Sequence, residues 1–225
     1  MPSAKKPTSK PTRRGRGKRS FLQFDGLLSR RQQEAAQSFF ASQDVQEQTY
    51  SAGTSSDSDS KSDRDSRIAL LGRPGGSTGL HEIPAWLDRK LRGACRVTHA
   101  VYGNTACPLG VDSRDRWTPR FEPAQYSEYR TGGHYRAWHT DADAVERDLM
   151  DLRCVTIVLM ISDEAAYAGG QLEVRLGADK GKASQVPLRA GDAVGFPSKH
   201  LVHRVAKCTS GLRQTLVFWA RRPGS

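Results

Sequence analysis

The sequence of 225 residues has no long apolar run, and only 36% of its residues are hydrophobic. No stretch approaches the roughly 18 consecutive apolar residues that a membrane-spanning helix needs. The first 20 residues also lack the apolar segment of a secretory signal. We therefore predict no membrane span and no membrane partner.

Cysteine is scarce and scattered along the chain. The four cysteines are Cys95, Cys107, Cys154 and Cys208, and no two of them form a C-x-x-C pair. This spacing is unlike that of cysteine-bound zinc sites and predicts reduced thiols. Reduced thiols favour an intracellular protein, in the cytoplasm or nucleus, with organelle targeting as an open alternative.

Acidic residues are too few to balance the basic ones, and the formal net charge is +11. Residues 1–20 contain eight basic side chains and no acidic one, whereas residues 21–81 carry a net charge of −2 and the rest of the chain +5. A tail without aromatic residues cannot form a core and is predicted to be disordered. Its composition is typical of a solvated tail, a nuclear-type address or a transit peptide, and a tether for nucleic acid is a less favoured alternative.

Composition divides the chain into three parts. Ser29 and Gln32 form a capping-box pattern ahead of apolar residues at helical spacing, which predicts a short helix. Residues 51–66 then contain seven Ser and four Asp, a composition typical of a linker. The predicted parts are a disordered basic tail over residues 1–20, a short helix with a Ser/Asp-rich linker over 21–66, and a globular domain over 67–225.

Short β-branched or aromatic runs dominate the globular part. Pro84 as a start, Leu87 and Leu91 four residues apart, and Gly93 as a stop predict one helix of about three turns. Five later runs bounded by Gly, Pro, Asp or Ser predict strands, namely FEPAQYSEY, RCVTIVLMI, GGQLEVRL, DAVGF and QTLVFWA. Many short strands with little helix among them favour an all-β sandwich or barrel with helices on its outside.

The segment YRTGGHYRAWHTDAD contains two candidate metal ligands, His139 and Asp141. Residues at i and i+2 of a strand point to the same side, so the imidazole and the carboxylate can converge on one ion. His203 follows about 60 residues later, ahead of another strand. Two imidazoles and one carboxylate leave about three of six octahedral positions open, an arrangement that suits non-haem Fe(II).

Arg213 follows His203 by ten residues and adjoins the strand QTLVFWA. An arginine buried near a metal cleft requires an anion, and its planar fork fits a carboxylate through two hydrogen bonds. Beside the candidate ligands, this arginine favours a carboxylate-bearing cosubstrate over a plain arginine at a strand end.

From about Phe121 to Ala220 the sequence resembles the 2-oxoglutarate- and Fe(II)-dependent oxygenases of the prolyl 4-hydroxylase-like type. The resemblance rests on motifs in a fixed order, namely Tyr129, Gly132-Gly133-His134-Tyr135, His139-Thr140-Asp141, Arg153-Cys154-Val155-Thr156, Gly169-Gly170-Gln171-Leu172, Ala190-Gly191-Asp192, Phe196-Pro197-Ser198, His203-Arg204-Val205 and Gly211-Leu212-Arg213.

This resemblance implies a mainly β fold with flanking helices and a double-stranded β-helix, or jelly-roll, core. It implies that His139, Asp141 and His203 bind the iron and that Arg213 binds the distal carboxylate of 2-oxoglutarate, these four being the expected catalytic residues. Tyr129 is expected to contact the same cosubstrate. The implied cofactors are Fe(II) and 2-oxoglutarate, with ascorbate as a reductant expected only at the level of the family.

The sequence departs from the family pattern between Tyr135 and His139, which are one residue further apart than in many relatives. His200 is a competing ligand, and His203 is preferred because the Val two positions later and the ten-residue step to Arg213 fit the family. The anchor is Arg rather than the Lys of collagen-type prolyl hydroxylases.

The resemblance implies hydroxylation of a C–H bond, in a prolyl or other amino-acid residue of a protein, a peptide or a free amino acid, with succinate and CO₂ as co-products. One alternative is a nucleic-acid or nucleobase demethylase of the same superfamily. Such enzymes usually have a longer histidine-to-arginine spacing and a second arginine. The other is a non-catalytic jelly-roll binding module, which the presence of all four key residues disfavours.

Overall fold

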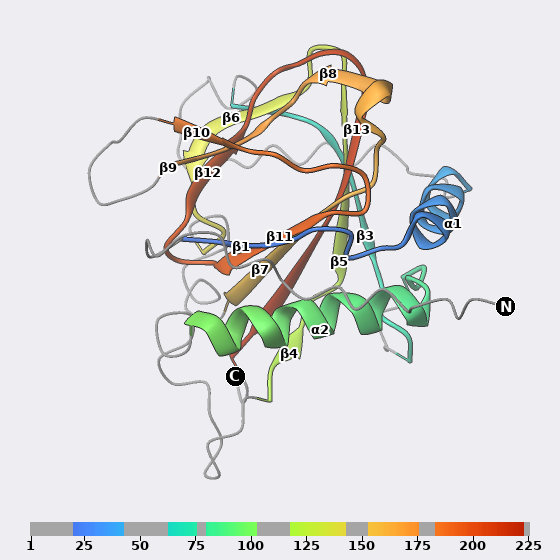
Figure 1. Ribbon diagram of the computed structural model, residues 1–225, viewed down its shortest axis with the longest axis vertical. Coiled ribbons are helices and arrows are strands. Elements are labelled where there is room, and N and C mark those ends of the chain that lie inside the picture. Colours follow the sequence, from blue (N-terminus) through green and yellow to red (C-terminus); the bar gives the residue numbers. More distant parts are fainter. Residues whose placement is uncertain are drawn as a thin grey trace, which may run out of the picture.

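The computed structural model describes residues 20–42, 63–75, 80–102, 118–142, 153–175 and 183–222 (Figure 1). In chain order the elements are β1 (Leu22–Phe24), α1 (Arg30–Ala41), β2 (Arg64–Asp65), β3 (Arg67–Leu71), α2 (Ala85–Tyr102), β4 (Arg120–Phe121), β5 (Ala124–Arg130), β6 (His134–His139), β7 (Arg153–Met160), the 3₁₀ turn η3 (Glu164–Ala166), β8 (Tyr167–Gly169), β9 (Leu172–Arg175), β10 (Ala183–Val186), β11 (Ala193–Pro197), β12 (Val202–Val205) and β13 (Cys208–Arg221).

The strands form two antiparallel sheets that face each other. The larger sheet has the order β1-β11-β7-β13-β5-β3, with β4 and β8 also paired to β13, and the smaller has the order β10-β9-β12-β6-β2. Figure 1 shows the smaller sheet above the larger one, with α2 below the larger sheet. The predicted mainly β architecture with helices on its outside is confirmed.

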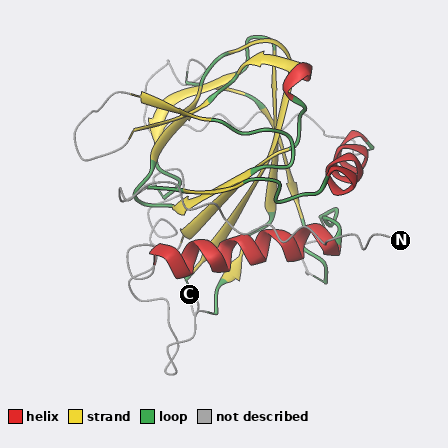
Figure 2. Cartoon of the chain, in the orientation of Figure 1, coloured by secondary structure: helices red, strands yellow, loops and turns green. Residues whose placement is uncertain are grey.

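Both helices lie outside the sandwich (Figure 2). The predicted short helix is α1, and Ser29 and Gln32 form the capping box, each side chain bonding the other residue's backbone N–H. Phe40 of α1 is buried and stacks on Tyr126 of β5 with ring centroids 4.5 Å apart. Because the same apolar cluster contains Leu87 of α2, the two helices cover one face of the larger sheet.

The helix predicted to end at Gly93 is longer than expected. Helix α2 runs through Gly93 to Tyr102. Leu87, Leu91 and Cys95, spaced four residues apart, are fully buried, and this stripe continues past the glycine. An interior glycine costs about 1 kcal/mol relative to alanine, less than burying that stripe contributes. No described helix, α2 included, is long and apolar enough to cross a membrane.

The folded unit begins before residue 67, where the sequence predicts its boundary. Strand β1 pairs with β11, and the backbone N–H of Gly26 donates to Oδ1 of Asp192 at 2.6 Å. These contacts, with the burial of α1, attach residues 21–41 to the larger sheet. Residues 1–19 of the predicted basic tail (residues 1–20) and most of the predicted Ser/Asp-rich linker lie outside the described residues.

The space between the sheets is apolar on one side. Strand β7 turns Val155, Ile157 and Leu159 toward the helices and turns Val158 and Met160 into a second cluster between the sheets. The remaining members of that second cluster come from both sheets and from the segments between strands, namely Leu172, Val174, Val186, Leu188, Val194, Phe196 and Leu201. The predicted metal ligands come from β6, the residues just after it and β12, and they contact β7 and β11, whereas Tyr129 and Arg213 lie on the paired strands β5 and β13.

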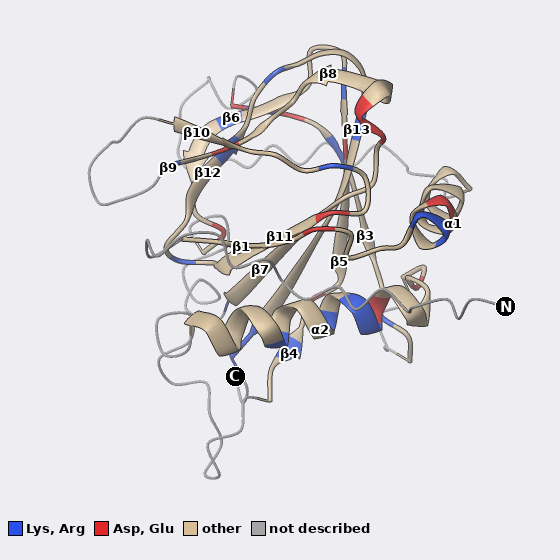
Figure 3. Ribbon diagram, in the orientation of Figure 1, with Lys and Arg blue, Asp and Glu red and all other residues tan. Residues whose placement is uncertain are grey.

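The prediction of reduced thiols holds for some of the cysteines only. Cys95 and Cys208 are buried free thiols, as predicted, but Cys154 is disulfide-bonded, so the prediction is wrong for this residue. Cys107 lies outside the described residues. Basic and acidic positions are interspersed along the described elements rather than gathered by sign (Figure 3).

Candidate metal centre

Two histidines meet across a strand pair of the smaller sheet. His139 ends β6, and its register partner on the antiparallel strand β12 is His203. Their ring centroids lie 4.3 Å apart at an interplanar angle of 51°. Register partners project to the same face of a sheet, so both imidazoles point into the space between the sheets.

Asp141 completes the group two residues after β6 ends. Its Oδ1 lies 3.7 Å from Nε2 of His203. One potential ligand atom from each of His139, Asp141 and His203 lies within 4.8 Å of the other two. Asp141 and His203 are buried and His139 is partly buried, so the three donors face a nearly enclosed position.

Backbone carbonyls determine how the two imidazoles are oriented. Nδ1 of His139 lies 3.0 Å from the carbonyl oxygen of Ala137, and Nδ1 of His203 lies 3.0 Å from that of Leu201. A carbonyl oxygen only accepts, so Nδ1 of each ring carries the proton and Nε2 presents a lone pair. Second partners of this kind fix the tautomer and direction of metal-binding histidines.

The carboxylate is held in a comparable way. Thr156 of β7 donates its hydroxyl to Oδ2 of Asp141 at 2.6 Å, and that hydroxyl is 2.9 Å from Oγ of Ser198. Arg153 donates to the backbone carbonyl of Asp141 at 3.2 Å and forms a two-pronged ion pair with Glu122. One carboxylate oxygen is therefore anchored, and the other faces the histidines.

The strand β6 bulges just before its last residue. His139 pairs with His203 and Tyr135 pairs with Val205, so three residues of β6 lie opposite one residue of β12. The bulge brings the ring of Tyr135 onto that of His139, with centroids 3.9 Å apart and planes 17° apart. The extra residue by which the sequence departs from the family pattern lies within this bulge.

Charge and burial place His139 and Asp141 in the protonation states that bind a cation. Burial, and secondarily His203, lower the pKa of His139 from 6.5 to about 4, although Asp141 opposes this. For Asp141, burial raises the pKa, but the two histidines, Thr156 and Arg153 outweigh it, so the pKa lies below its ordinary value. A neutral imidazole and an ionised carboxylate are the forms required of metal ligands.

The depressed pKa of His139 predicts how the metal-free protein responds to acid. The unfolded chain binds a proton at pH 6.5 and the folded chain only near pH 4, so the stability present at neutral pH is lost as the pH falls through this window. The expected loss from this residue between pH 7 and pH 5 is about 2 kcal/mol. Urea unfolding of chelator-treated protein at both pH values measures it.

The control variants for this measurement are His139→Gln and His200→Gln. His139→Gln is expected to remove most of the loss, whereas His200, which is exposed, is expected to leave it in place when changed to Gln. Equal pH dependence in the wild type and His139→Gln would contradict the assigned burial effect.

Arg213 is a buried cation without a hydrogen-bonded anion. It is 1% exposed, and none of its three guanidinium nitrogens has a hydrogen-bond partner among the described residues. Burial lowers its pKa, and the nearby Tyr129 and Tyr167 side chains oppose this shift. A guanidinium nevertheless keeps its proton in proteins, so its charge requires a partner that this part of the chain does not supply.

The surroundings of Arg213 are built to hold it in place. Tyr129 of β5 is its register partner, and the guanidinium carbon lies 5.3 Å from the centroid of the Tyr129 ring. The Tyr167 hydroxyl forms no hydrogen bond with the guanidinium of Arg213 and donates instead to Sδ of Met160 at 3.7 Å. A side chain at Gly170, which has a φ of +65°, would place its Cβ 2.7 Å from Cδ of Arg213. The absence of a side chain at Gly170 therefore leaves the space that the Arg213 side chain occupies.

The structure brings together most of the residues that the sequence singles out. His139, Asp141 and His203 form one group, and Arg213 lies beside Tyr129. Neither His134 nor the exposed His200 belongs to that group within the described residues, so the competing ligand is disfavoured. The roles of the hydroxyls that hold Asp141 and of the Tyr135 ring were missed, because they depend on contacts between distant segments.

A family model describing the 2OG-Fe(II) oxygenase superfamily matches residues 124–221. A PKHD-type hydroxylase of Parvibaculum lavamentivorans is 39% identical over 95 residues, which cover 42% of this chain and 40% of the relative. One from a Psychrobacter species is 34% identical over 104 residues, covering 44% and 38%. The chain thus spans about two fifths of the length of these curated relatives.

Solved structures share the fold at low sequence identity. A Pseudomonas putida prolyl-4-hydroxylase has a TM-score of 0.63 at 22% identity, covering 92% of this chain and 95% of that one. A prolyl hydroxylase from Trichoplax adhaerens, in complex with a hypoxia inducible factor peptide fragment, has a TM-score of 0.59 at 16% identity, covering 90% and 84%. With the two facing sheets, these similarities confirm the predicted jelly-roll core.

Proposed function

We propose that this chain, which belongs to the 2-oxoglutarate- and Fe(II)-dependent oxygenase superfamily, is a dioxygenase that hydroxylates a C–H bond of a prolyl or other amino-acid residue. One observation carries the proposal. Two imidazole Nε2 atoms and one ionised carboxylate converge on a nearly enclosed position, and a buried arginine without an anion shares the interior with them.

The donor set fits Fe(II). Two neutral histidines and one carboxylate on one face suit non-haem Fe(II), because about three coordination positions remain for other ligands. His139, Asp141 and His203 would hold this ion, each already oriented by a carbonyl or a hydroxyl. The chain spends little additional conformational entropy on binding it, since the ligands are preorganised.

The unpaired arginine fits 2-oxoglutarate. This cosubstrate is a dicarboxylate, so one carboxylate can form a two-pronged ion pair with Arg213 while the other end reaches the metal. The buried charge then gains the partner that the described residues do not provide. Tyr129, stacked beside the guanidinium, would limit how the cosubstrate sits against it.

When bound, iron and 2-oxoglutarate supply the oxidising power for hydroxylation. The balanced reaction converts substrate C–H, O₂ and 2-oxoglutarate into substrate C–OH, succinate and CO₂. The chain itself holds the ligands, orients the cosubstrate and excludes water through the apolar cluster between the sheets. Ascorbate as a reductant is proposed on the family resemblance alone.

The names of the structures similar in fold support a peptide as the substrate class. Both solved structures compared above are named as prolyl hydroxylases, and the one from Trichoplax adhaerens is in complex with a peptide fragment. We extend that substrate class to this chain, with a prolyl residue as the first candidate and other amino-acid residues as the second.

The test uses purified protein with Fe(II), 2-oxoglutarate, O₂ and pools of synthetic peptides containing central proline or other residues. Mass spectrometry is expected to find products heavier by about 16 Da that depend on 2-oxoglutarate and appear with succinate. Asp141→Ala is the inactive reference. Peptides that gain no mass while succinate still forms would exclude the peptidyl substrate, and equal succinate from both proteins would refute the oxygenase.

A further inference from the structure

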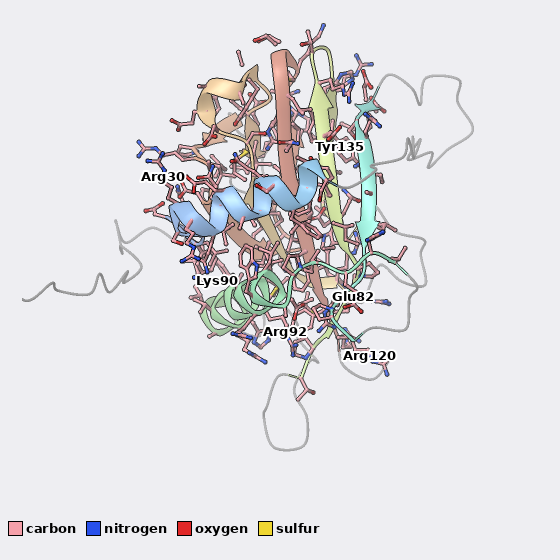
Figure 4. All side chains as sticks on the ribbon, turned by 90° about the vertical axis from the view of Figure 1, so that its right-hand side faces the viewer. Arg30, Glu82, Lys90, Arg92, Arg120 and Tyr135 are labelled. Carbon is pink, nitrogen blue, oxygen red and sulfur yellow. The ribbon has the colours of Figure 1, made fainter. Side chains whose placement is uncertain are left out.

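A second arginine lies beside the metal centre, on the short edge strand β2. Arg64 is the register partner of Tyr135 on β6, and its guanidinium carbon lies 4.8 Å from the centroid of the Tyr135 ring. The Tyr135 ring also stacks on the imidazole ring of His139. Figure 4 shows Tyr135 beside the segment that carries β2 and β3, far from the α2 residues Lys90 and Arg92.

Arg64 forms no ion pair within the part of the chain that the structure describes. Its Nε donates to Oγ of Ser66 at 2.8 Å. The acidic neighbour Asp63 pairs with Arg136 instead, at 3.6 Å. Among the described residues no partner is bonded to the two terminal amino groups of Arg64, and the Tyr135 ring and the bond to Ser66 hold the guanidinium plane.

Arg64 differs from Arg213 in where it can act. Arg213 is fully enclosed and lies among Tyr129, Tyr167 and Cys208, deep between the sheets. Arg64 is partly exposed and lies on the edge strand of the smaller sheet. A cosubstrate carboxylate bound by the enclosed arginine leaves the outer one for a group that enters later.

We infer that Arg64 binds a carboxylate of the substrate and makes the enzyme selective for acidic peptides. The inference rests on the proposed hydroxylase function and deepens it. A guanidinium held on an aromatic ring with a free fork recognises a carboxylate through two charge-assisted hydrogen bonds. Only the Tyr135 ring separates it from a metal ligand, so the acidic residue lies within about three residues of the hydroxylated one in an extended peptide.

The contrasting explanation is that Arg64 only protects an exposed sheet edge from pairing with other chains. Charged residues commonly serve this purpose on edge strands. An edge role depends on charge of either sign and is indifferent to substrate, whereas a binding role depends on positive charge and on the substrate's carboxylate. Selectivity between matched peptides separates the two.

The experiment compares amide-capped peptides in which a central proline is flanked by Glu, Gln or Lys. Affinity is measured by calorimetry on full-length protein with Fe(II) and 2-oxoglutarate under nitrogen, and kcat/KM is measured in air. The wild type is expected to prefer the Glu peptide over the Gln peptide by about 10-fold or more. Arg64→Gln is expected to abolish the preference, Arg64→Lys to keep part of it, and Arg64→Glu to favour the Lys peptide.

Arg189→Gln is the control, because this arginine is exposed and pairs with Glu164, so its removal leaves the ion pair between Asp63 and Arg136 in place. It is expected to retain the wild-type preference. A wild type that binds or hydroxylates the Glu peptide no better than the Gln peptide overturns the inference, as does a preference that survives in Arg64→Gln. Failure of the proposed function is seen separately, as wild-type protein that releases no more succinate than Asp141→Ala.

Discussion

Asp141→Ala is expected to abolish iron binding and succinate formation together. The substitution removes the only carboxylate of the three-residue group and leaves two neutral imidazoles, which hold a divalent cation weakly. The expected loss of Fe(II) affinity exceeds 100-fold, since altering even a residue that only supports a ligand typically costs 10- to 100-fold. His139→Ala and His203→Ala are expected to behave alike, because each removes one oriented Nε2.

Metal content after anaerobic loading, together with succinate release, measures this effect. His134→Ala and His200→Ala are the matched controls, since each removes a histidine that lies on or next to the strands β6 and β12 but outside the group. Thr156→Val tests the support of the carboxylate and is expected to lower affinity by about 10- to 100-fold while leaving some activity. Iron retained at wild-type levels in Asp141→Ala would show that the three residues do not form the metal centre.

The second large effect concerns Arg213→Met, which keeps much of the side-chain volume but removes the charge. The apparent KM for 2-oxoglutarate is expected to rise about 100-fold with iron retained, because the lost ion pair is buried and charge-assisted. Titration of succinate formation against 2-oxoglutarate, alongside metal content, measures both quantities. Arg130→Gln is the control, since exposed Arg130 ends the strand β5 that carries Tyr129.

Stability measurements distinguish a binding role of Arg213 from a structural one. In the absence of cosubstrate, Arg213→Met is expected to be at least as stable as the wild type, because an unpaired buried cation has been removed. Added 2-oxoglutarate and metal are expected to raise the urea midpoint of the wild type but hardly that of the variant. Lost iron with unchanged 2-oxoglutarate affinity would contradict the assignment.

Much of the fold could be predicted because local patterns agree with the tertiary packing. The capping box formed by Ser29 and Gln32 marks the start of α1 whatever lies around it. Strand β7 is buried along nearly its whole length, as its uninterrupted run of largely apolar residues indicates. The prediction failed at Gly93, where burial of the surrounding helix face outweighs the local preference of glycine, and at residue 67, because the pairing of β1 with β11 joins segments about 170 residues apart.

The sequence by itself determined which side chains can form the site. The H-x-D spacing of His139 and Asp141, the later His203 and the ten-residue step to Arg213 are properties of the chain alone. Only the tertiary structure decided how these side chains are oriented and what surrounds them. The Thr156 hydroxyl on Asp141, the unpaired guanidinium of Arg213 and the position of Arg64 over Tyr135 all arise from strands that meet across the sheets. Such contacts join residues far apart in sequence, and no local pattern encodes the distance between them.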